Sequence, residues 1–501
     1  MDTIIADAQD SNNYPKKVLV IGTGLASYGT CLGLLEKDYL QVDVIDIGLT
    51  KPYLNQKNIS VPNSKDINGS FFPYGINDKR WSSELHSERM CSSHAYGGYS
   101  KAYSGSILQP KNEDLKDWPL EALPKAKHYS HILSTLQIDQ KFDELNTIFP
   151  LNPNEKCTRL PKKSYLGYSR IAKTYKKDKQ GRINIYPFDC SEIFNEWIDK
   201  GKIKYYNNRK VISLKENKNK NIIVEIEKAN GNEYLEYEYV FLAAGCINTT
   251  AIVDISLYGA GKRNYTIKSA PFLLQLHFKL ANPLSIINWR KLKSSQNSDY
   301  ALCKYFLEIN NKYTGGYWSH TQIGDLNRII IDKLKSKLPK FLWNITNLIK
   351  IFFQFSISVF HSSQGIDSKL ITEVKHVHES KLIQSIKIIE PEYTCNLGQV
   401  IAVKCGVFSN FKKLLMLPIP FSMVLGNIAR GNKLGGWHYG ATLPFSKTNN
   451  SKGFCKVTGQ LNGIQHVFVT DASTFPSIPG SSVALLTMTN AYRIAAEANL
   501  K

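Results

Sequence analysis

The sequence predicts an α/β fold of the doubly wound, Rossmann-like type. Near the N-terminus, Lys17 to Gly29 has the pattern of a buried strand, a glycine turn and the start of a helix. More than 400 residues later, His466 to Glu497 has the pattern of a strand ended by one aspartate and followed by an apolar helix. We therefore expect the chain to close back on itself and to complete at its end a site begun at its start.

The composition is that of a globular protein long enough to form two hydrophobic cores. The chain has 501 residues, of which 43% are hydrophobic and 21% are charged. Its nine cysteines are scattered from Cys31 to Cys455 without a C-x-x-C pair. This pattern favours reduced thiols in a cytoplasmic protein over a disulfide framework or a zinc site. Residues 1–14 are polar and lack the apolar core of a secretory signal, so we expect a flexible tail there.

The chain is strongly basic, with a formal net charge of +21 and a pI near 9.3. Basic chains often bind nucleic acid, but the sequence holds no recognition helix, zinc finger or aromatic RNA-binding signature, so we expect no nucleic-acid partner. The charge instead indicates anionic substrates or membrane surfaces. His376 and His378 could form at most a weak metal pair on one face of a strand, and we expect no metal site.

The first strand, turn and helix have the pattern of a dinucleotide-binding motif. Gly22 permits a tight turn, and Gly24 lets a pyrophosphate approach the backbone at the helix N-terminus. Ser27 replaces the third glycine of G-x-G-x-x-G and is small enough for close packing of helix on strand. The next strand ends at Asp46, where an acid binds a ribose hydroxyl in such motifs. An acid rather than an arginine favours FAD or NAD over NADP.

Two later segments are rich in small residues that let a cofactor approach the backbone. The stretch Tyr96–Ser100 holds two adjacent glycines, which either present N–H groups to a phosphate or flavin ring or form a simple loop. Ala244 and Gly245 end a predicted strand, where small side chains leave room for a cofactor. A second strand–G-x-G–helix unit is absent from the sequence, so we expect electrons to come from the substrate rather than from NADPH.

A histidine between glycines is the best candidate for acid–base chemistry. Removing a hydride from a carbinol carbon requires loss of the hydroxyl proton, and histidine, with a reference pKa of about 6.5, suits that task. His438 lies between Gly436 and Gly440, so little side-chain bulk screens its ring. We interpret the other ten of the eleven histidines as structural residues.

The polar residues before the last helix have two interpretations each. Asp471 follows a predicted strand over 467–470, so it either contacts a cofactor or caps a helix. Ser481 and Ser482 could donate a hydrogen bond to a substrate oxygen or serve as the N-cap of the last helix. We expect the capping role for one of the two serines.

One apolar segment, residues 341–360, has too many polar interruptions for a membrane-spanning helix. Its first part has helical periodicity and its second part alternates, which predicts a core helix followed by a half-buried strand. The alternative is peripheral membrane contact through residues 333–360, favoured by the lysines at its start, Lys333, Lys335, Lys337 and Lys340.

These motifs together resemble the glucose–methanol–choline (GMC) oxidoreductase family of FAD enzymes. The matching stretches lie in family order and span nearly the whole chain, with a poor match over residues 265–430. In its tail the chain is more similar to bacterial relatives that accompany polysaccharide biosynthesis than to glucose oxidase. The matching stretches are Val18–Gly29 with Asp46, Gly97-Gly98-Tyr99-Ser100, Asp117–Leu120, Phe241–Gly245, Trp437–Gly440 and Asp471–Glu497.

The resemblance implies an FAD-binding domain assembled from discontinuous segments and an α+β substrate domain with an antiparallel sheet. It also implies oxidation of a CH–OH group of an alcohol or carbohydrate to a carbonyl. His438 falls at the family's active-site histidine. Asp471 and Ala472 fall where the flavin's ribityl chain is held, and Thr487 falls in the helix beneath the flavin. The electron acceptor, oxygen or a carrier, is not specified by the sequence.

Two positions depart from the family pattern. The family usually has His or Asn four residues before the threonine, and here Val483 stands there. The neighbouring Ser482 is the candidate for the missing hydrogen-bond donor. Tyr103 stands near the place of an asparagine in the flavin loop. Two alternatives therefore stay open: a flavin-binding protein that has lost alcohol chemistry and acts as a partner or peripheral-membrane module, and a flavoenzyme of another reaction type.

The expected domain organisation follows from the same motifs. A flexible tail (1–14) precedes three FAD-binding segments, the last of which carries the active-site histidine. A connecting segment and a substrate-binding domain lie between them. The expected bounds are 15–125, 191–265 and 431–501 for the FAD-binding segments, 126–190 for the connecting segment and 266–430 for the substrate-binding domain.

Overall fold

The computed structural model describes most of the chain in separate stretches. These are 15–51, 64–65, 71–72, 81–138, 164–177, 181–280, 305–310, 318–325, 339–360, 366–376, 382–391, 397–419, 438–446 and 454–500, except positions 82, 88–89, 104, 169, 182, 229–230 and 271.

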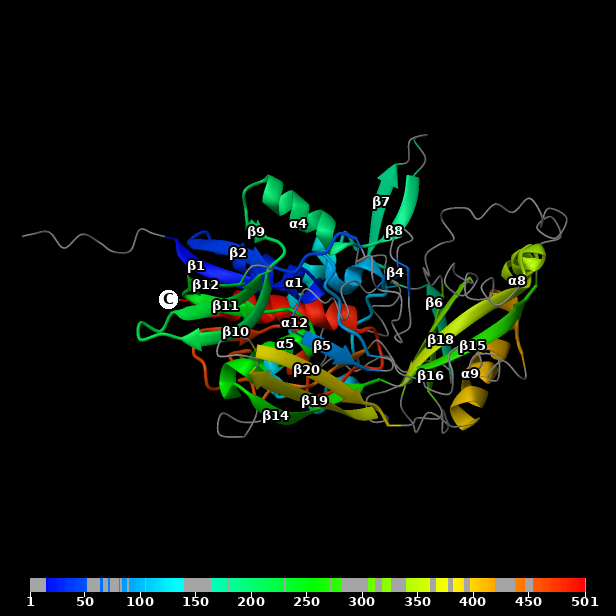
Figure 1. Cartoon of the computed structure of the whole chain (residues 1–501). Helices are drawn as coiled ribbons and strands as arrows, with labels where there is room; N and C mark the ends of the chain where they lie inside the picture. Colours follow the sequence, from blue (N-terminus) through cyan, green and yellow to red (C-terminus); the bar gives the residue numbers. More distant parts are fainter. Residues whose placement is uncertain are drawn as a thin grey trace, which may run out of the picture.

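A parallel five-stranded sheet forms the centre of the first half of the molecule (Figure 1). Every neighbouring pair in it is parallel, and its strands come from the start, the middle and the end of the chain. The predicted Rossmann-like sheet of discontinuous segments is therefore confirmed. In spatial order the strands are β23 (Val467–Val469), β13 (Tyr239–Leu242), β1 (Lys16–Ile21), β2 (Leu40–Ile45) and β9 (Lys204–Tyr206).

The first and last long helices, α1 (Leu25–Leu34) and α12 (Val483–Glu497), pack tightly against each other. A Cβ on Gly29 would lie 2.1 Å from the carbonyl oxygen of Met488, and one on Gly33 would lie 2.7 Å from the amide of Ala496. Only glycine allows this approach. The end of the chain is thereby fixed against its beginning, as the sequence predicts.

An antiparallel three-stranded sheet packs on β1 through its last strand. The predicted strands joined by polar hairpins are observed here as β10 (Lys210–Glu216), β11 (Ile222–Lys228) and β12 (Gly231–Tyr237). Helix α5 (Cys246–Tyr258) follows β13 and packs against β10. The cover of the parallel sheet thus includes a β layer as well as helices.

Two further large sheets complete the fold. One contains β22 (Tyr439–Gly440), β14 (Gly261–Ser269), β19 (Ile366–His376), β20 (Leu382–Ile389) and β5 (Ser83–His86). The other contains β21 (Met416–Pro418), β15 (Phe272–Lys279), β18 (Phe353–Phe360), β17 (Trp318–Asp325), β16 (Tyr305–Asn310) and β6 (Ser164–Tyr168), all antiparallel. The expected antiparallel sheet is confirmed.

The segment 341–360 forms helix α8 (Ile345–Phe352) and then strand β18, in the predicted order. The expected core position of the helix is wrong for its start, because Phe341 is 80% exposed and Ile345 is 41% exposed. Helices α9 (Leu397–Ser409) and α10 (Phe411–Leu414) lie at the same end of the molecule (Figure 1). Within the described stretches, no helix is long and apolar enough to cross a membrane. The cysteines that can be assessed there are free thiols, and most are buried.

The remaining elements are short or peripheral. They are β3 (Ser64–Lys65), β4 (Phe71–Phe72), β7 (Lys173–Lys177), β8 (Ile183–Pro187), α2 (Asn112–Leu115), α3 (Ala126–Thr135), α4 (Cys190–Asp199) and the 3-10 helices η1 (Gly98–Lys101), η2 (Leu120–Ala122), η8 (Lys340–Leu342) and η10 (Ala472–Thr474).

Candidate functional site

The glycine turn after β1 has the geometry that the motif requires. Gly22 has φ +107°, and a Cβ there would lie 2.6 Å from the carbonyl oxygen of Ala243 at the end of β13. Gly24 is the N-cap residue of α1 and makes no side-chain cap bond, so the first N–H groups of the helix stay open to a ligand. Ser27 is buried and its Oγ donates to Ala243 O at 3.3 Å, which fixes the helix closely on the sheet.

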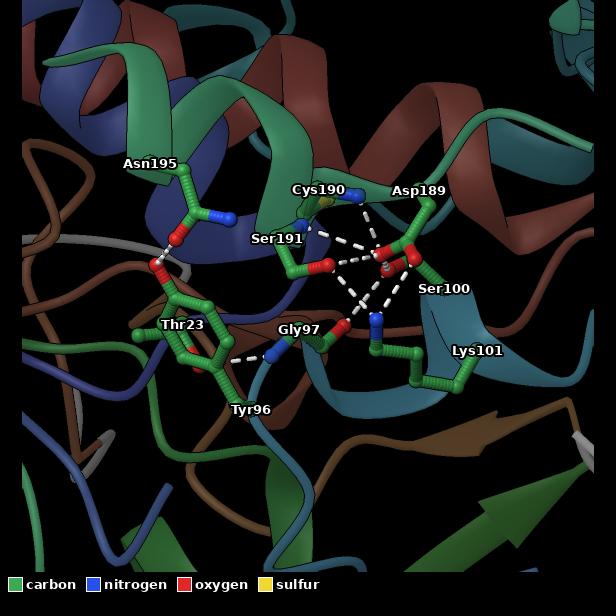
Figure 2. A network of polar contacts seen from close by, with 9 residues as sticks. All are labelled: Thr23, Tyr96, Gly97, Ser100, Lys101, Asp189, Cys190, Ser191 and Asn195. Carbon is green, nitrogen blue, oxygen red and sulfur yellow. Dashed lines mark hydrogen bonds and ion pairs between the residues drawn. The ribbon is translucent and has the colours of Figure 1, made fainter. Parts of the chain in front are cut away.

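Thr23, between the two glycines, joins two predicted cofactor segments (Figure 2). Its Oγ1 donates to a carboxylate oxygen of Asp46. The same Oγ1 accepts a hydrogen bond from the Gly97 amide at 2.9 Å. The side chain is 1% exposed, so water does not compete for these bonds. The Thr23 hydroxyl therefore holds both the Asp46 carboxylate and the second glycine loop, at Gly97, against the first glycine turn.

Asp46 lies at the carboxyl end of β2 beside two tyrosines. Burial raises the pKa of Asp46 to about 7, although hydrogen bonds from Thr23 and from two backbone amides oppose the shift. The rings of Tyr96 and Tyr205 lie 5.0 Å apart. Burial raises the pKa values of both hydroxyls, and the nearby Asp46 carboxylate adds to the shift. An acid next to an aromatic pair suits a ribose with its attached base.

The second glycine loop touches the first one directly. Gly97 and Gly98 have φ of +92° and +53°, and a Cβ on Gly98 would lie 3.0 Å from the Cα of Gly24. The Oγ of Ser100 donates to Gly97 O at 2.6 Å and accepts from the Cys190 amide at 3.0 Å. The two glycine turns therefore line one cradle, while the Ser100 hydroxyl is used to shape the loop.

A buried ion pair anchors this loop to α4 (Figure 2). The Nζ of Lys101 donates to Asp189 Oδ2 and to Ser191 Oγ, both at 2.6 Å. The Asp189 side chain is 5% exposed and also caps α4 by accepting from the Ser191 amide at 3.0 Å. Tyr96, at the start of the loop, donates to Asn195 Oδ1 at 2.8 Å. The loop is thus fixed at both ends by one helix.

The third segment meets the site at Asp471, the N-cap residue of η10. Its Oδ1 accepts from the Ser473 amide at 3.0 Å, and its Oδ2 accepts from Thr249 Oγ1 on α5 at 2.5 Å. Burial raises its pKa, opposed by hydrogen bonds that include the Gly245 amide. The capping interpretation is confirmed, and contact with a cofactor stays a prediction. Gly245 has φ +83° and no atom within 4 Å of a Cβ position, so space is open beside it.

The strand that carries His438 is clamped between β14 and η10. The carbonyl of His438 accepts from the Ala270 amide at 3.0 Å, and the carbonyl of Ala472 accepts from the Ala441 amide at 2.9 Å. A Cβ on Gly440 would lie 2.3 Å from the same Ala472 oxygen. The glycine after the histidine is therefore required for close passage over Ala472, and the spacing fixes His438 near the Asp471 turn.

Tyr439 connects the same strand to the glycine loop. Its hydroxyl donates to the carbonyl of Cys91 and lies 3.4 Å from the hydroxyl of Tyr99, which donates to the same carbonyl. Tyr99 lies in η1, directly after the two glycines. The candidate base is thus tied through its neighbour to the second cofactor segment as well as to the third.

The imidazole of His438 is suited to accept a proton. Its residue is half-buried, and the ring makes no hydrogen bond to the described part of the chain. Burial lowers the pKa of His438 to about 4, because desolvation disfavours the charged form. The ring is neutral at pH 7, so one nitrogen has a free lone pair.

The residues at the start of α12 divide into a cap and a free hydroxyl. Ser482 is the N-cap: its Oγ accepts from the Ala484 amide at 3.3 Å and donates to Ser106 O at 2.5 Å. The hydrogen of Ser482 is therefore occupied. Ser481 is buried, with 3% of its surface exposed, and its hydroxyl has no hydrogen-bond partner among the described residues. Thr487 is half-buried on the second turn of α12.

Several site residues were not predicted from the sequence. Thr23 carried a weak signal as the middle residue of G-x-G, but Thr249, Lys101 and Asp189 had none, because their partners lie far away in the chain. Three predicted features, Gly436, Trp437 and His378, lie outside the described residues. Within the described stretches, no cluster of His, Cys, Asp and Glu could hold a metal ion.

No protein-family model and no curated protein sequence matches the chain. Solved structures share its fold. Formate oxidase from Aspergillus oryzae RIB40, in a structure concerned with modification of its FAD, gives a TM-score of 0.57 at 12% identity over 97% of this chain and 98% of that one. Pyridoxine 4-oxidase from Mesorbium loti gives 0.53 at 11% over 96% and 98%. An FAD-dependent oxidoreductase from Chaetomium thermophilum gives 0.51 at 13% over 96% and 98%.

The low identities mean that these similarities establish the fold. They confirm the α/β class with its Rossmann-like sheet and separate antiparallel sheet over nearly the whole length. They do not bear on the expected similarity to bacterial polysaccharide-associated relatives, which stays a prediction.

Proposed function

We propose that this protein is an FAD-dependent oxidoreductase that oxidises a CH–OH group to a carbonyl. The observation that carries the proposal is the joint at Thr23, which holds the Asp46 carboxylate and the Gly97 amide at the open N-terminus of α1. A carboxylate for ribose beside N–H groups for pyrophosphate suits a dinucleotide. Two of the solved structures with the same fold are described as an FAD-dependent oxidoreductase and a formate oxidase with modified FAD, which supports FAD over NAD.

The residues present fit FAD. A Cβ on Gly22 would collide with Ala243 and a Cβ on Gly98 would press on Gly24, so the two turns can lie this close together only as glycines. Space is open beside Gly245, whose amide donates to Asp471, and a ribityl chain would lie there. Gly22, Gly24, Gly97 and Gly98 would hold the phosphates, and Asp46 would hold the ribose. Ala244, Gly245, Asp471, Ala472 and Thr487 would line the path of the flavin end.

His438 is the proposed base. Bound FAD would supply the hydride acceptor. One imidazole nitrogen of His438 takes the proton of the substrate hydroxyl as the C–H hydride leaves, so that an alcohol loses one proton and one hydride and becomes a carbonyl. The low pKa of His438 keeps the ring able to accept this proton at neutral pH.

Ser481 is proposed as the donor that orients the substrate oxygen, in place of the residue missing at Val483. Its buried hydroxyl lacks a partner among the described residues. A buried hydroxyl without a hydrogen bond costs free energy unless a ligand supplies the partner. Ser482, whose hydrogen is committed to Ser106 O, is left with the capping role.

The experiment is to purify the protein, record its visible spectrum and add candidate alcohols and sugars without oxygen. We expect a yellow flavin spectrum that bleaches with one class of alcohol. His438→Ala should retain the flavin and lower the bleaching rate by about 10²–10⁴-fold. With the wild type, the rate constant should stay flat from neutral pH towards pH 4 and fall below it, as His438 becomes protonated.

His86→Ala is the matched control. His86 is exposed on β5, at one edge of the sheet whose other edge strand is β22, directly after His438. Ser481→Ala should slow bleaching without loss of stability, whereas Ser482→Ala should lower the free energy of unfolding by about 1 kcal/mol.

A flavin that no alcohol reduces would leave a flavin-binding role without this chemistry. Reduction by a substrate that lacks a hydroxyl would indicate another reaction type. Absence of any flavin would refute the proposal.

A further inference from the structure

Many large apolar side chains are exposed to water at the end of the molecule that carries α8. Eight of the fourteen large apolar side chains that are exposed in the described stretches belong to this end. We call them the distal surface: Phe278, Leu280, Phe341, Trp343, Ile345, Ile401, Phe408 and Leu415. Phe341 is the most exposed of them, at 80%. In a monomer such a concentration marks an interaction site.

The members of the distal surface are connected through three elements. Phe278, near the end of β15, stacks on Phe352 of α8 with ring centroids 5.9 Å apart. The Leu280 amide donates to the Leu415 carbonyl at 2.9 Å, which joins the same strand to the end of α10. Figure 1 shows α8 and α9 at the end of the molecule opposite the one that carries β1 and β2.

The segments that carry the distal surface are basic. The segments 272–280, 339–352 and 397–419 contain no Asp or Glu, and their lysines are Lys279, Lys340, Lys350, Lys404, Lys412 and Lys413. Lys340, Lys412 and Lys413 are exposed, and none of them makes an ion pair with another described residue. Aromatic side chains beside unpaired lysines are typical of elements that lie in the interface of an anionic bilayer.

We infer that the distal surface docks on an anionic lipid bilayer, with Phe341 and Trp343 entering the headgroup region and the lysines binding lipid phosphates. Like charge disfavours a second copy, because a two-fold interface through this surface would bring the lysines of both copies together. Anionic lipids instead neutralise them, and each lysine near such a surface strengthens binding about fivefold. No helix in the described stretches is long and apolar enough to span the bilayer.

The test is flotation of the full-length protein with vesicles of phosphatidylcholine alone or mixed with phosphatidylglycerol. We expect flotation only with the mixed vesicles, and loss of binding at high salt, because the Debye length falls from about 10 Å at 0.1 M to about 3 Å at 1 M. Phe341→Ser with Trp343→Ala, and separately Lys412→Glu with Lys413→Glu, should each lower the partition constant at least about tenfold.

Matched variants elsewhere separate this surface from general stickiness and charge. Leu120→Ser removes an equally exposed side chain (79%) from η2, and Lys218→Glu reverses an exposed lysine at the β10–β11 hairpin. Both should bind as the wild type does. The inference is overturned if neither vesicle type binds, if the control variants weaken binding as much as the distal ones, or if the distal variants only dissolve a dimer. Flavin content and bleaching should be unchanged in the distal variants, so this test stands apart from the proposed reaction.

Discussion

The cofactor end and the distal end of this molecule differ in which side chains are buried and which are exposed to water. Around Thr23 and Asp189, hydroxyl, carboxylate and ammonium groups are buried and bonded to one another. Around α8, aromatic rings stay in water beside lysines without ion pairs to described residues. The contacts of the first region form within the chain, without a ligand, and they contribute to the stability of the fold. The second region contributes little to folding, which indicates that its side chains serve an interaction outside the chain.

The largest effect is expected where the buried ion pair is broken. Asp189→Ala should lower the free energy of unfolding by about 3–5 kcal/mol, because Lys101 is left buried without its partner and α4 loses its cap. Chemical denaturation followed by circular dichroism measures this change. The exposed Glu196–Lys200 pair lies on the same helix, and Glu196→Ala should leave stability unchanged. Equal losses in both variants would show that burial does not distinguish the two pairs.

A smaller effect is expected at Asp46, in the pH dependence of FAD binding. Burial raises the pKa of the carboxyl to about 7, whereas ribose hydroxyls donate to the carboxylate and lower its pKa in the complex. A proton is therefore released on binding, and affinity is full above pH 7 and falls by up to about tenfold per pH unit below it. Fluorescence titration of the apoprotein with FAD on both sides of pH 7 measures this slope.

Asp46→Asn is the control for that slope. It cannot ionise, so its weaker binding should be independent of pH across the same window. An unchanged affinity for the wild type on both sides of pH 7 would contradict the assignment of Asp46 to the ribose, as would a slope that persists in Asp46→Asn.

The smallest effect on stability is expected at the distal surface. Phe341→Ser should change the free energy of unfolding by no more than about 0.5 kcal/mol, because the ring is 80% exposed in the folded protein. Phe241→Ala, which removes a fully buried ring from β13, should lower it by about 3–5 kcal/mol. A large loss in Phe341→Ser would mean that the distal surface is part of the fold and would remove the contrast between the two ends.

The sequence was most informative where function depends on local backbone geometry. The turn at Gly22 and Gly24 and the acid at Asp46 could be expected from short motifs, because they depend on a missing Cβ and on a fixed strand–turn–helix spacing. The helix and strand over 341–360 followed from periodicity alone. Ser482 could be narrowed only to cap or donor, since both roles use the same hydroxyl.

The sequence by itself determined the Rossmann-like fold and the set of glycine turns, since these follow from backbone freedom and the periodicity of apolar residues. Only the tertiary structure decided how the turns are joined: Thr23 to Gly97, Lys101 to Asp189 and Thr249 to Asp471. These contacts link residues from about 70 to over 200 positions apart, and a hydrogen bond between distant segments leaves no periodic trace in either one. The same holds for the distal surface, where neighbouring elements of one sign of charge meet only after the chain has folded.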